Sequence, residues 1–276
     1  MLSKIVLRLI TIVFGAAGLF SAVHGKNDSV IYRAASFFCD FPHKRVEVMK
    51  SVYEKPGLNF LVLHDDENTG LEAAHDFCSV HGGSITELRY GDERNVAFGT
   101  EKVRFSFDPN QIFNNAGALK TLRKYSISKP PPSAVEKIRT LAISIINKYN
   151  PDSMGYIITL HNNTEGRFNI NSYIQDKLLI SAADSVYVNS EMDLDDFILV
   201  TEPVFFSYLK SKAINTVLQS KKAADGSLSV YAQANKIPYL NIEVQDGHKD
   251  EHLHLIQIVD RMFREIGYRN LYGKSR

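Results

Sequence analysis

The segment LVLHDDENTG, residues 61–70, changes abruptly from apolar to polar and acidic side chains. His64 follows three apolar residues, and Glu67 comes three positions later. Histidine and glutamate are both zinc ligands, and this spacing lets both reach one ion when the strand ends at the histidine. A polar turn at the end of a strand is the alternative explanation for the same residues.

Two further strand-like segments also carry a histidine or a glutamate after an apolar run. GYIITLHNNT places His161 after an apolar run, and PYLNIEVQDG places Glu243 in a similar position. Two histidines and one carboxylate form a ligand set for catalytic zinc, which leaves the fourth position for water. A second carboxylate beside that water can act as a general base. The pattern therefore predicts a hydrolytic metal site.

The elements that must position these residues alternate along the chain. Runs rich in β-branched and aromatic residues predict strands at 58–64, 84–90, 103–108, 155–161, 196–201 and 238–244. Helical periodicity predicts helices over 69–83, 133–149 and 252–267, and Gly82 is a stop signal for the first. Alternating strands and helices are typical of an α/β fold with a largely parallel, buried sheet. Ligands bind beyond the carboxyl ends of the strands in such folds.

Four motifs in order resemble the zinc carboxypeptidase superfamily, and most closely its succinylglutamate desuccinylase and aspartoacylase branch. HDDENT resembles the H-G-x-E ligand motif, with Asp65 in place of the glycine, and FDPNQIF resembles the D-x-N-R-x-F segment. TLHNNT and NIEVQDG resemble the segments that bear the second histidine and the catalytic glutamate. The resemblance covers about residues 56–265. It does not extend to the C-terminal β-domain of aspartoacylases, for which we expect no counterpart in this sequence.

The resemblance implies a single-domain α/β/α sandwich with a central mixed, mostly parallel sheet. It also implies one zinc ion per chain, held by His64, Glu67 and His161, with Glu243 as the base for amide hydrolysis. An arginine upstream of the D-x-N segment would polarise the carbonyl. Arg94 is favoured because it opens a strand, and Arg104 is the alternative.

The predicted substrate-binding residues depart from the family pattern at one position. The family places an arginine after Asn110 to bind a substrate carboxylate, whereas this chain has Gln111. A neutral amide cannot match the two charge-assisted bonds of a guanidinium. Arg167, shortly after the histidine segment, is a substitute cation, and Arg104 is a further candidate for substrate binding. Asp108 and Asn110 could instead only form a turn around Pro109.

Residues 1–25 have a basic start, a short apolar middle and small residues near Gly25, as in a secretory signal peptide. We expect 26–276 to be the catalytic domain, secreted or periplasmic, and an uncleaved membrane anchor is the alternative. Cys39 and Cys78 are the cysteines of the chain. Outside the cytoplasm they could form a disulfide, although two buried free thiols are an alternative.

The expected function is cleavage of an amide bond in a small peptide or N-acyl amino acid, with a peptidoglycan stem peptide as one possible substrate. A ligand-binding protein on the same scaffold is the alternative. The formal net charge of +1 gives no reason to expect a nucleic-acid partner, and no stable membrane insertion is expected after signal cleavage. His248, His252 and His254 could form a second metal cluster, but an exposed helix start explains them as well.

Overall fold

The computed structural model describes residues 31–177 and 179–267. The predicted signal peptide over 1–25 lies outside these residues. The strands are β1 (Ile31–Phe41), β2 (Lys44–Tyr53), β3 (Asn59–Val62), β4 (Ser84–Arg89), β5 (Val96–Gly99), β6 (Arg104–Phe107), β7 (Ile157–Asn163), β8 (Ala183–Tyr187), β9 (Phe197–Val200), β10 (Thr216–Gln219) and β11 (Tyr239–Gln245). The α-helices are α1 (Asn68–His81), α2 (Asn115–Tyr125), α3 (Pro132–Tyr149), α4 (Pro151–Met154), α5 (Ser172–Gln175), α6 (Pro203–Ser211), α7 (Leu228–Ala234) and α8 (Lys249–Glu265). The short 3-10 helices are η1 (Pro109–Gln111) and η2 (Ile180–Ala182).

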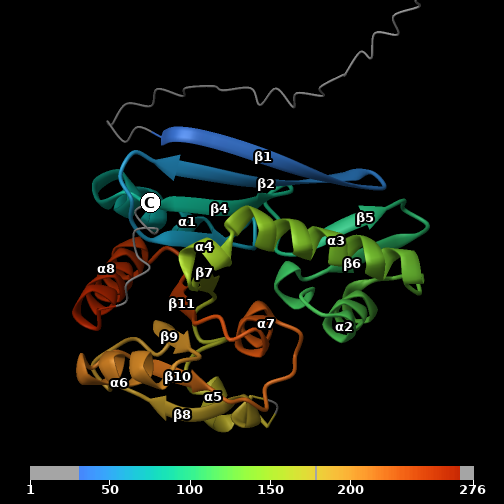
Figure 1. Cartoon of the computed structure of the whole chain (residues 1–276). Coiled ribbons are helices and arrows are strands. Elements are labelled where there is room, and N and C mark those ends of the chain that lie inside the picture. Colours follow the sequence, from blue (N-terminus) through green and yellow to red (C-terminus); the bar gives the residue numbers. More distant parts are fainter. Residues whose placement is uncertain (1–30, 178, 268–276) are drawn as a thin grey trace, which may run out of the picture.

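A nine-stranded sheet runs through the molecule in the order β1-β2-β4-β3-β7-β11-β9-β10-β8. Figure 1 shows these strands from β1 at the top of the view to β8 at the bottom. β5 and β6 form a separate two-stranded sheet. The central strands β3, β7 and β11 are adjacent and parallel, so their carboxyl ends meet at one edge.

The sheet is mixed, as expected, but it is less parallel than the sequence predicts. Parallel pairings join β3 to β4, β3 to β7, β7 to β11 and β9 to β10. Antiparallel pairings join β1 to β2, β2 to β4, β9 to β11 and β8 to β10. The continuous parallel run β4-β3-β7-β11 therefore lies at the centre, where helical crossovers cover both faces, and a separate parallel pair, β9–β10, lies nearer one edge.

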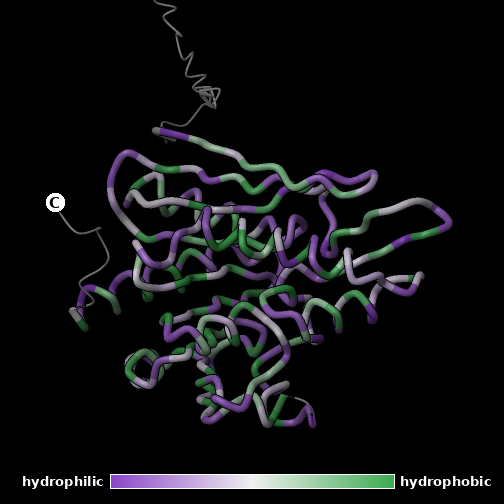
Figure 2. Tube along the Cα trace, turned by 45° about the vertical axis from the view of Figure 1, so that its right-hand side comes forward, coloured by the Kyte–Doolittle hydropathy of each residue, from purple (hydrophilic) through white to green (hydrophobic). Residues whose placement is uncertain are grey.

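Helices cover the two faces of the sheet and enclose two apolar clusters, which makes the fold an α/β/α sandwich. Alternate residues of each central strand enter opposite clusters, as the period of two requires. Phe60 of β3 belongs to the cluster that contains residues of α1, α6 and α8, whereas Leu61 belongs to the cluster that contains residues of α2, α3 and α7. In Figure 2 hydrophobic stretches run along the inner strands, while the tips of the long hairpins are hydrophilic.

The three predicted helices correspond to α1, α3 and α8, and the six predicted strands to β3, β4, β6, β7, β9 and β11. Sequence patterns missed the hairpin β1–β2, whose second strand alternates between buried and partly exposed residues. In β2 apolar and polar residues alternate, as in VEVMK, so the segment contains no continuous apolar run like those of the central strands. Gly82 ends α1 with a positive φ of 79°, as its position as a stop signal predicts.

The predicted disulfide between Cys39 and Cys78 is wrong. Cys39 lies on β1 and packs in the cluster that contains α3, whereas Cys78 lies on α1 in the cluster on the opposite face. Both thiols are free and buried. The sheet separates the two side chains, so the alternative of two buried thiols holds.

Among the described helices, none has both the length and the apolar character needed to span a membrane.

Candidate metal centre

The predicted ligands lie at the shared edge of β3 and β7. His64 lies two residues after the end of β3, and Glu67 is the residue before α1. His161 lies on β7, which pairs with β3 through Leu61 and Thr159. Parallel pairing therefore brings two segments that are distant in sequence to the same end of the sheet.

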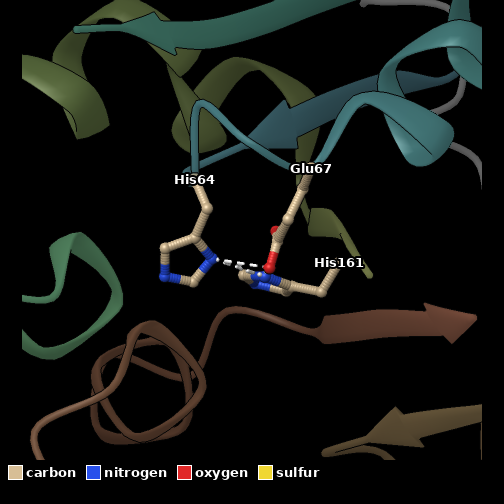
Figure 3. Close-up of side chains that lie close together, drawn as sticks. All are labelled: His64, Glu67 and His161. Carbon is tan, nitrogen blue, oxygen red and sulfur yellow. Dashed lines mark hydrogen bonds and ion pairs between the residues drawn. The ribbon is translucent and has the colours of Figure 1, made fainter. Parts of the chain in front are cut away.

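Three donor atoms of these residues converge (Figure 3). His64 Nδ1 lies 2.9 Å from Glu67 Oε1 and 3.1 Å from His161 Nδ1. Glu67 Oε2 lies 2.7 Å from His161 Nδ1. All three side chains are buried. Within the described residues they form a group whose ligand atoms all lie within 4.8 Å of one another.

The residues present fit a metal ion. Both histidines aim the same nitrogen, Nδ1, at one carboxylate, which is the donor chemistry of a catalytic zinc site. A metal requires each Nδ1 to be free of its proton, so Nε2 must carry it. For His64 that proton has an acceptor, because Nε2 lies 2.9 Å from Asp108 Oδ1. A carboxylate in this position orients a ligating histidine in metal sites.

Asp108 is both a turn residue and a site residue. It caps η1 by accepting the backbone N–H of Asn110 at 2.8 Å, and the same Oδ1 faces His64. The turn around Pro109 thus holds the carboxylate in place, so the two interpretations of this segment are compatible.

Opposite charges determine the protonation of the centre. Burial disfavours a charged His64, but the carboxylates of Glu67 and Asp108 outweigh it and raise the pKa of His64 to about 10. Burial likewise disfavours an ionised Glu67, but the two histidines lower its pKa well below the usual value. A metal ion must therefore displace a proton from His64, which makes binding pH-dependent.

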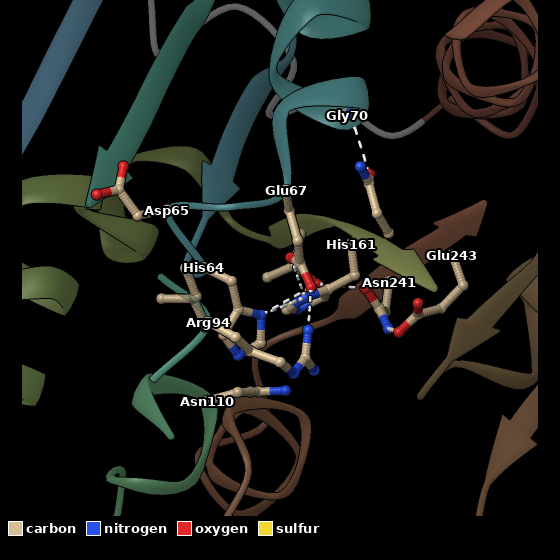
Figure 4. A network of polar contacts seen from close by, with 12 residues as sticks. His64, Asp65, Glu67, Gly70, Arg94, Asn110, His161, Asn241 and Glu243 are labelled. Carbon is tan, nitrogen blue, oxygen red and sulfur yellow. Dashed lines mark hydrogen bonds and ion pairs between the residues drawn. The ribbon is translucent and has the colours of Figure 1, made fainter. Parts of the chain in front are cut away.

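Asp65 has a role that sequence patterns do not reveal. Its Oδ2 accepts the backbone N–H groups of Tyr90, Gly91 and Asp92, and the last of these bonds is 3.0 Å long. Asp65 therefore binds the turn that leads to Arg94. Figure 4 shows Asp65 pointing away from the metal ligands, toward β4.

Arg94 reaches the centre from this turn, just before β5. Its Nη1 donates to Glu67 Oε1 at 2.7 Å, and Tyr90 Oη donates to its backbone carbonyl at 2.9 Å. The Arg94 side chain is 53% exposed, so part of the guanidinium faces the adjoining cavity. The structure thus places Arg94, rather than Arg104, beside the predicted ligands.

Glu243 lies on β11 in direct register with His161 of β7. Its side chain is buried, and Asn241 Nδ2 donates to its Oε1 at 2.8 Å (Figure 4). Burial raises the pKa of Glu243 above its ordinary value. A higher pKa makes a carboxylate a stronger proton acceptor.

A cavity of about 570 Å³ opens in front of the centre. Asn110, Gln111 and Arg167, the predicted substrate-binding residues, line it together with Arg94 and Glu243. Arg104 does not line it, because it lies exposed on β6. β6 belongs to the two-stranded sheet, and the Arg104 side chain is exposed to solvent there.

Other residues of the cavity had no sequence signal. Tyr173, Asp225 and Ser229 reach it from α5, the loop before α7 and α7 itself. Asn110 Oδ1 accepts the backbone N–H of Leu228 at 3.2 Å and so joins this loop to η1. Only the tertiary packing of the loop brings it to the site.

The histidines 248, 252 and 254 do not form a second metal cluster. His252 is fully buried, and in the described part of the chain neither of its ring nitrogens has a hydrogen-bond partner. His248 and His254 border a different cavity of about 640 Å³. These residues do lie at the start of a helix, because α8 begins at Lys249, but the expected exposure does not hold for the buried His252.

No family model and no curated protein matches this chain. Among solved structures, a candidate metallopeptidase from Shewanella amazonensis is similar at 12% identity and a TM-score of 0.43, over 84% of this chain and 86% of the other. One from Shewanella baltica has 10% identity and a TM-score of 0.41, over 80% and 81%. An aspartoacylase family protein from Mesorhizobium loti has 10% identity and a TM-score of 0.35, over 88% of this chain and 68% of the other. All these TM-scores lie below 0.5, so we argue the function from the side chains.

Proposed function

We propose that this protein is a zinc-dependent hydrolase that cleaves an amide bond in a small peptide or N-acyl amino acid. The observation that carries the proposal is the convergence of His64 Nδ1, His161 Nδ1 and the Glu67 carboxylate at the rim of a cavity. Two histidines and one carboxylate leave a zinc position open for reaction. A bound zinc ion would polarise the substrate carbonyl and lower the pKa of water.

Glu243 is the proposed general base. It lies beside His161 on the neighbouring strand and borders the cavity. It would take a proton from the attacking water and pass that proton to the leaving amine nitrogen. Arg94, which is anchored to Glu67 and partly exposed to the cavity, would stabilise negative charge on the carbonyl oxygen.

Arg167 is the proposed partner of a substrate carboxylate. Gln111 lines the cavity but carries no charge, whereas Arg167 lines it with a guanidinium that makes no ion pair with the described residues. A guanidinium binds a carboxylate through two parallel charge-assisted bonds. Asn110 would contribute its Nδ2 group, because its Oδ1 already accepts the N–H of Leu228.

We place the protein outside the cytoplasm on the basis of the leader-like residues 1–25. A bacterial stem peptide is a substrate that such a location would supply. This part of the proposal depends on the leader and not on the cavity.

The test compares the parent protein with Glu243→Gln on one preparation each. We expect about one zinc per chain in both proteins, and hydrolysis of N-acyl amino acids or short peptides reduced roughly 10²–10⁴-fold in the variant. Glutamine keeps the shape of the side chain but cannot accept the proton. His64→Ala is the matched variant that should lose zinc and remain folded.

Two results would contradict the proposal. A Glu243→Gln variant with zinc bound and unchanged kcat would exclude Glu243 as the base. A parent that binds zinc and short peptides but cleaves none of them would favour the alternative of a ligand-binding protein.

A further inference from the structure

Polar side chains continue below Glu243 along one face of β7 and β11. Tyr239, Asn241 and Glu243 alternate along β11 and therefore point to the same side. Thr159 occupies the same side of β7, in register with Asn241. Thr159 and Tyr239 are buried, so each of their polar atoms needs a partner.

Hydrogen bonds join these four side chains in one line. Tyr239 Oη lies 2.6 Å from Thr159 Oγ1, which donates to Asn241 Oδ1 at 2.9 Å. Asn241 Nδ2 then donates to Glu243 Oε1 at 2.8 Å. The line crosses from β11 to β7 and back to β11, so it depends on their parallel register.

The donors in this line point in one direction. An ionised carboxylate only accepts, so Asn241 must turn its Nδ2 group to Glu243. Its Oδ1 then faces Thr159, whose hydroxyl proton we assign to this 2.9 Å bond rather than to the longer contact of 3.4 Å with the backbone carbonyl of Leu240. Tyr239 must therefore donate to Thr159. Each group fixes the orientation of the next one, and the line ends on the carboxylate.

The bond from Asn241 leaves the second oxygen of Glu243 available. Glu243 Oε1 is occupied by Asn241, whereas Oε2 has no hydrogen-bond partner among the residues that the structure describes. Glu243 borders the cavity. A carboxylate held through one oxygen can present the other to a proton without rotating away.

We propose that Asn241 is a positioning residue for Glu243, and that Thr159 and Tyr239 fix the orientation of its amide. This inference rests on the proposed role of Glu243 as the general base. It adds a function for three residues outside the predicted ligand set, of which Asn241 and Tyr239 also line the cavity. These hydrogen bonds would hold the Glu243 carboxylate in the orientation in which its Oε2 can accept a proton from water.

The first experiment measures kcat and KM for Asn241→Leu and Thr159→Val. Asn241→Leu should lower kcat roughly 10- to 100-fold, the usual worth of a hydrogen bond to a charged group, with KM and zinc content nearly unchanged. Thr159→Val keeps the shape and should lower kcat less, because Asn241 remains but is free to rotate. Thr86→Val, a buried threonine of β4 whose hydroxyl has no partner in the described residues, is the matched control and should keep full kcat.

The double variant separates positioning from general destabilisation. In the Asn241→Leu background, Thr159→Val should change kcat less than twofold, because the bond through which it acts is already gone. Independent effects that multiply, or losses of kcat that follow the loss of zinc or of folded protein, would overturn the proposal.

An experiment without substrate keeps this inference separate from the proposed function. The side-chain amide signal of Asn241 in a ¹⁵N-labelled sample, assigned by its loss in Asn241→Leu, should shift in both Thr159→Val and Glu243→Gln. A signal that stays unchanged in both variants would refute the line of hydrogen bonds. If the signal shifts as expected but the parent cleaves no peptide, the proposed function fails and the line of bonds stands.

Discussion

Asp108 accepts the Nε2–H of His64 in a buried hydrogen bond 2.9 Å long. This contact fixes the ring so that Nδ1 faces Glu67, and the backbone N–H of Asn110 donates to the same carboxylate oxygen and holds it in place. The first prediction follows from this pair. Asp108→Asn should weaken zinc binding roughly 10- to 100-fold, because outer partners of ligating histidines usually contribute that much.

The measurement is competition with a chelator of known zinc affinity, at one pH and with folded protein. Asp152→Asn, at an exposed aspartate of α4, is the control and should bind zinc like the parent. An Asp108→Asn protein with parental affinity would mean that His64 is oriented by its other contacts alone.

Arg167→Gln should impair binding of substrates that carry a free carboxylate. We expect their KM to rise roughly 10- to 100-fold, because a charge-assisted bond is lost, while the amide-capped form of the same substrate shows little change. Arg104→Gln is the matched control, since Arg104 lies outside the cavity. An equal effect of Arg167→Gln on capped and uncapped substrates would show that Arg167 does not bind the carboxylate.

The two cysteines should behave as free, protected thiols. Burial raises the pKa of both Cys39 and Cys78, and their opposite positions across the sheet prevent a bridge. A thiol reagent should therefore label two cysteines per chain in denaturant without reductant, and label the folded protein slowly. Two cysteines that become reactive only after reduction would contradict this arrangement.

Asp196 should make the free energy of unfolding depend on pH. Burial raises the pKa of Asp196 to about 6, from an ordinary value of 3.8, and Asp193 adds to the rise. His248 and the N–H of Gln245 act in the opposite direction. The folded protein thus holds this proton more tightly than the unfolded chain, so its contribution to stability falls as the pH rises from about 4 to about 6.

Asp196→Asn removes that titration and should gain stability relative to the parent over this interval. Urea unfolding of both proteins at pH 4, 5, 6 and 7 gives the comparison, and other titrating groups cancel in the difference. A difference that stays constant across the four pH values would show that Asp196 does not titrate in this range.

Sequence patterns single out the three side chains that converge in the structure, because the physical rule behind them is local. Strand ends are readable from apolar runs, and His64, His161 and Glu243 each lie at or near the end of one. The bonds between side chains are not readable in this way. Asn241 and Thr159 are 82 positions apart, and their bond depends on the pairing of β7 with β11.

The incorrect disulfide has a related cause. A leader indicates the redox environment, but it gives no distance between two cysteines. The antiparallel outer strands were missed for a different reason. β1 and β2 lie at one edge of the sheet and β2 buries only some of its residues, so these strands lack the continuous apolar run by which the buried central strands are recognised.

The separation of the ligands along the chain has a thermodynamic consequence. Glu67 and His161 are 94 positions apart, so an unfolded chain does not hold them together. A zinc ion would therefore bind the native state and not the denatured state, and its binding free energy would add to the free energy of unfolding. At a free zinc concentration 100 times Kd this addition is about 2.7 kcal/mol, a rise in Tm of roughly 5–10 °C for a chain of this size. The melting temperature would then report zinc occupancy directly, before any substrate is known.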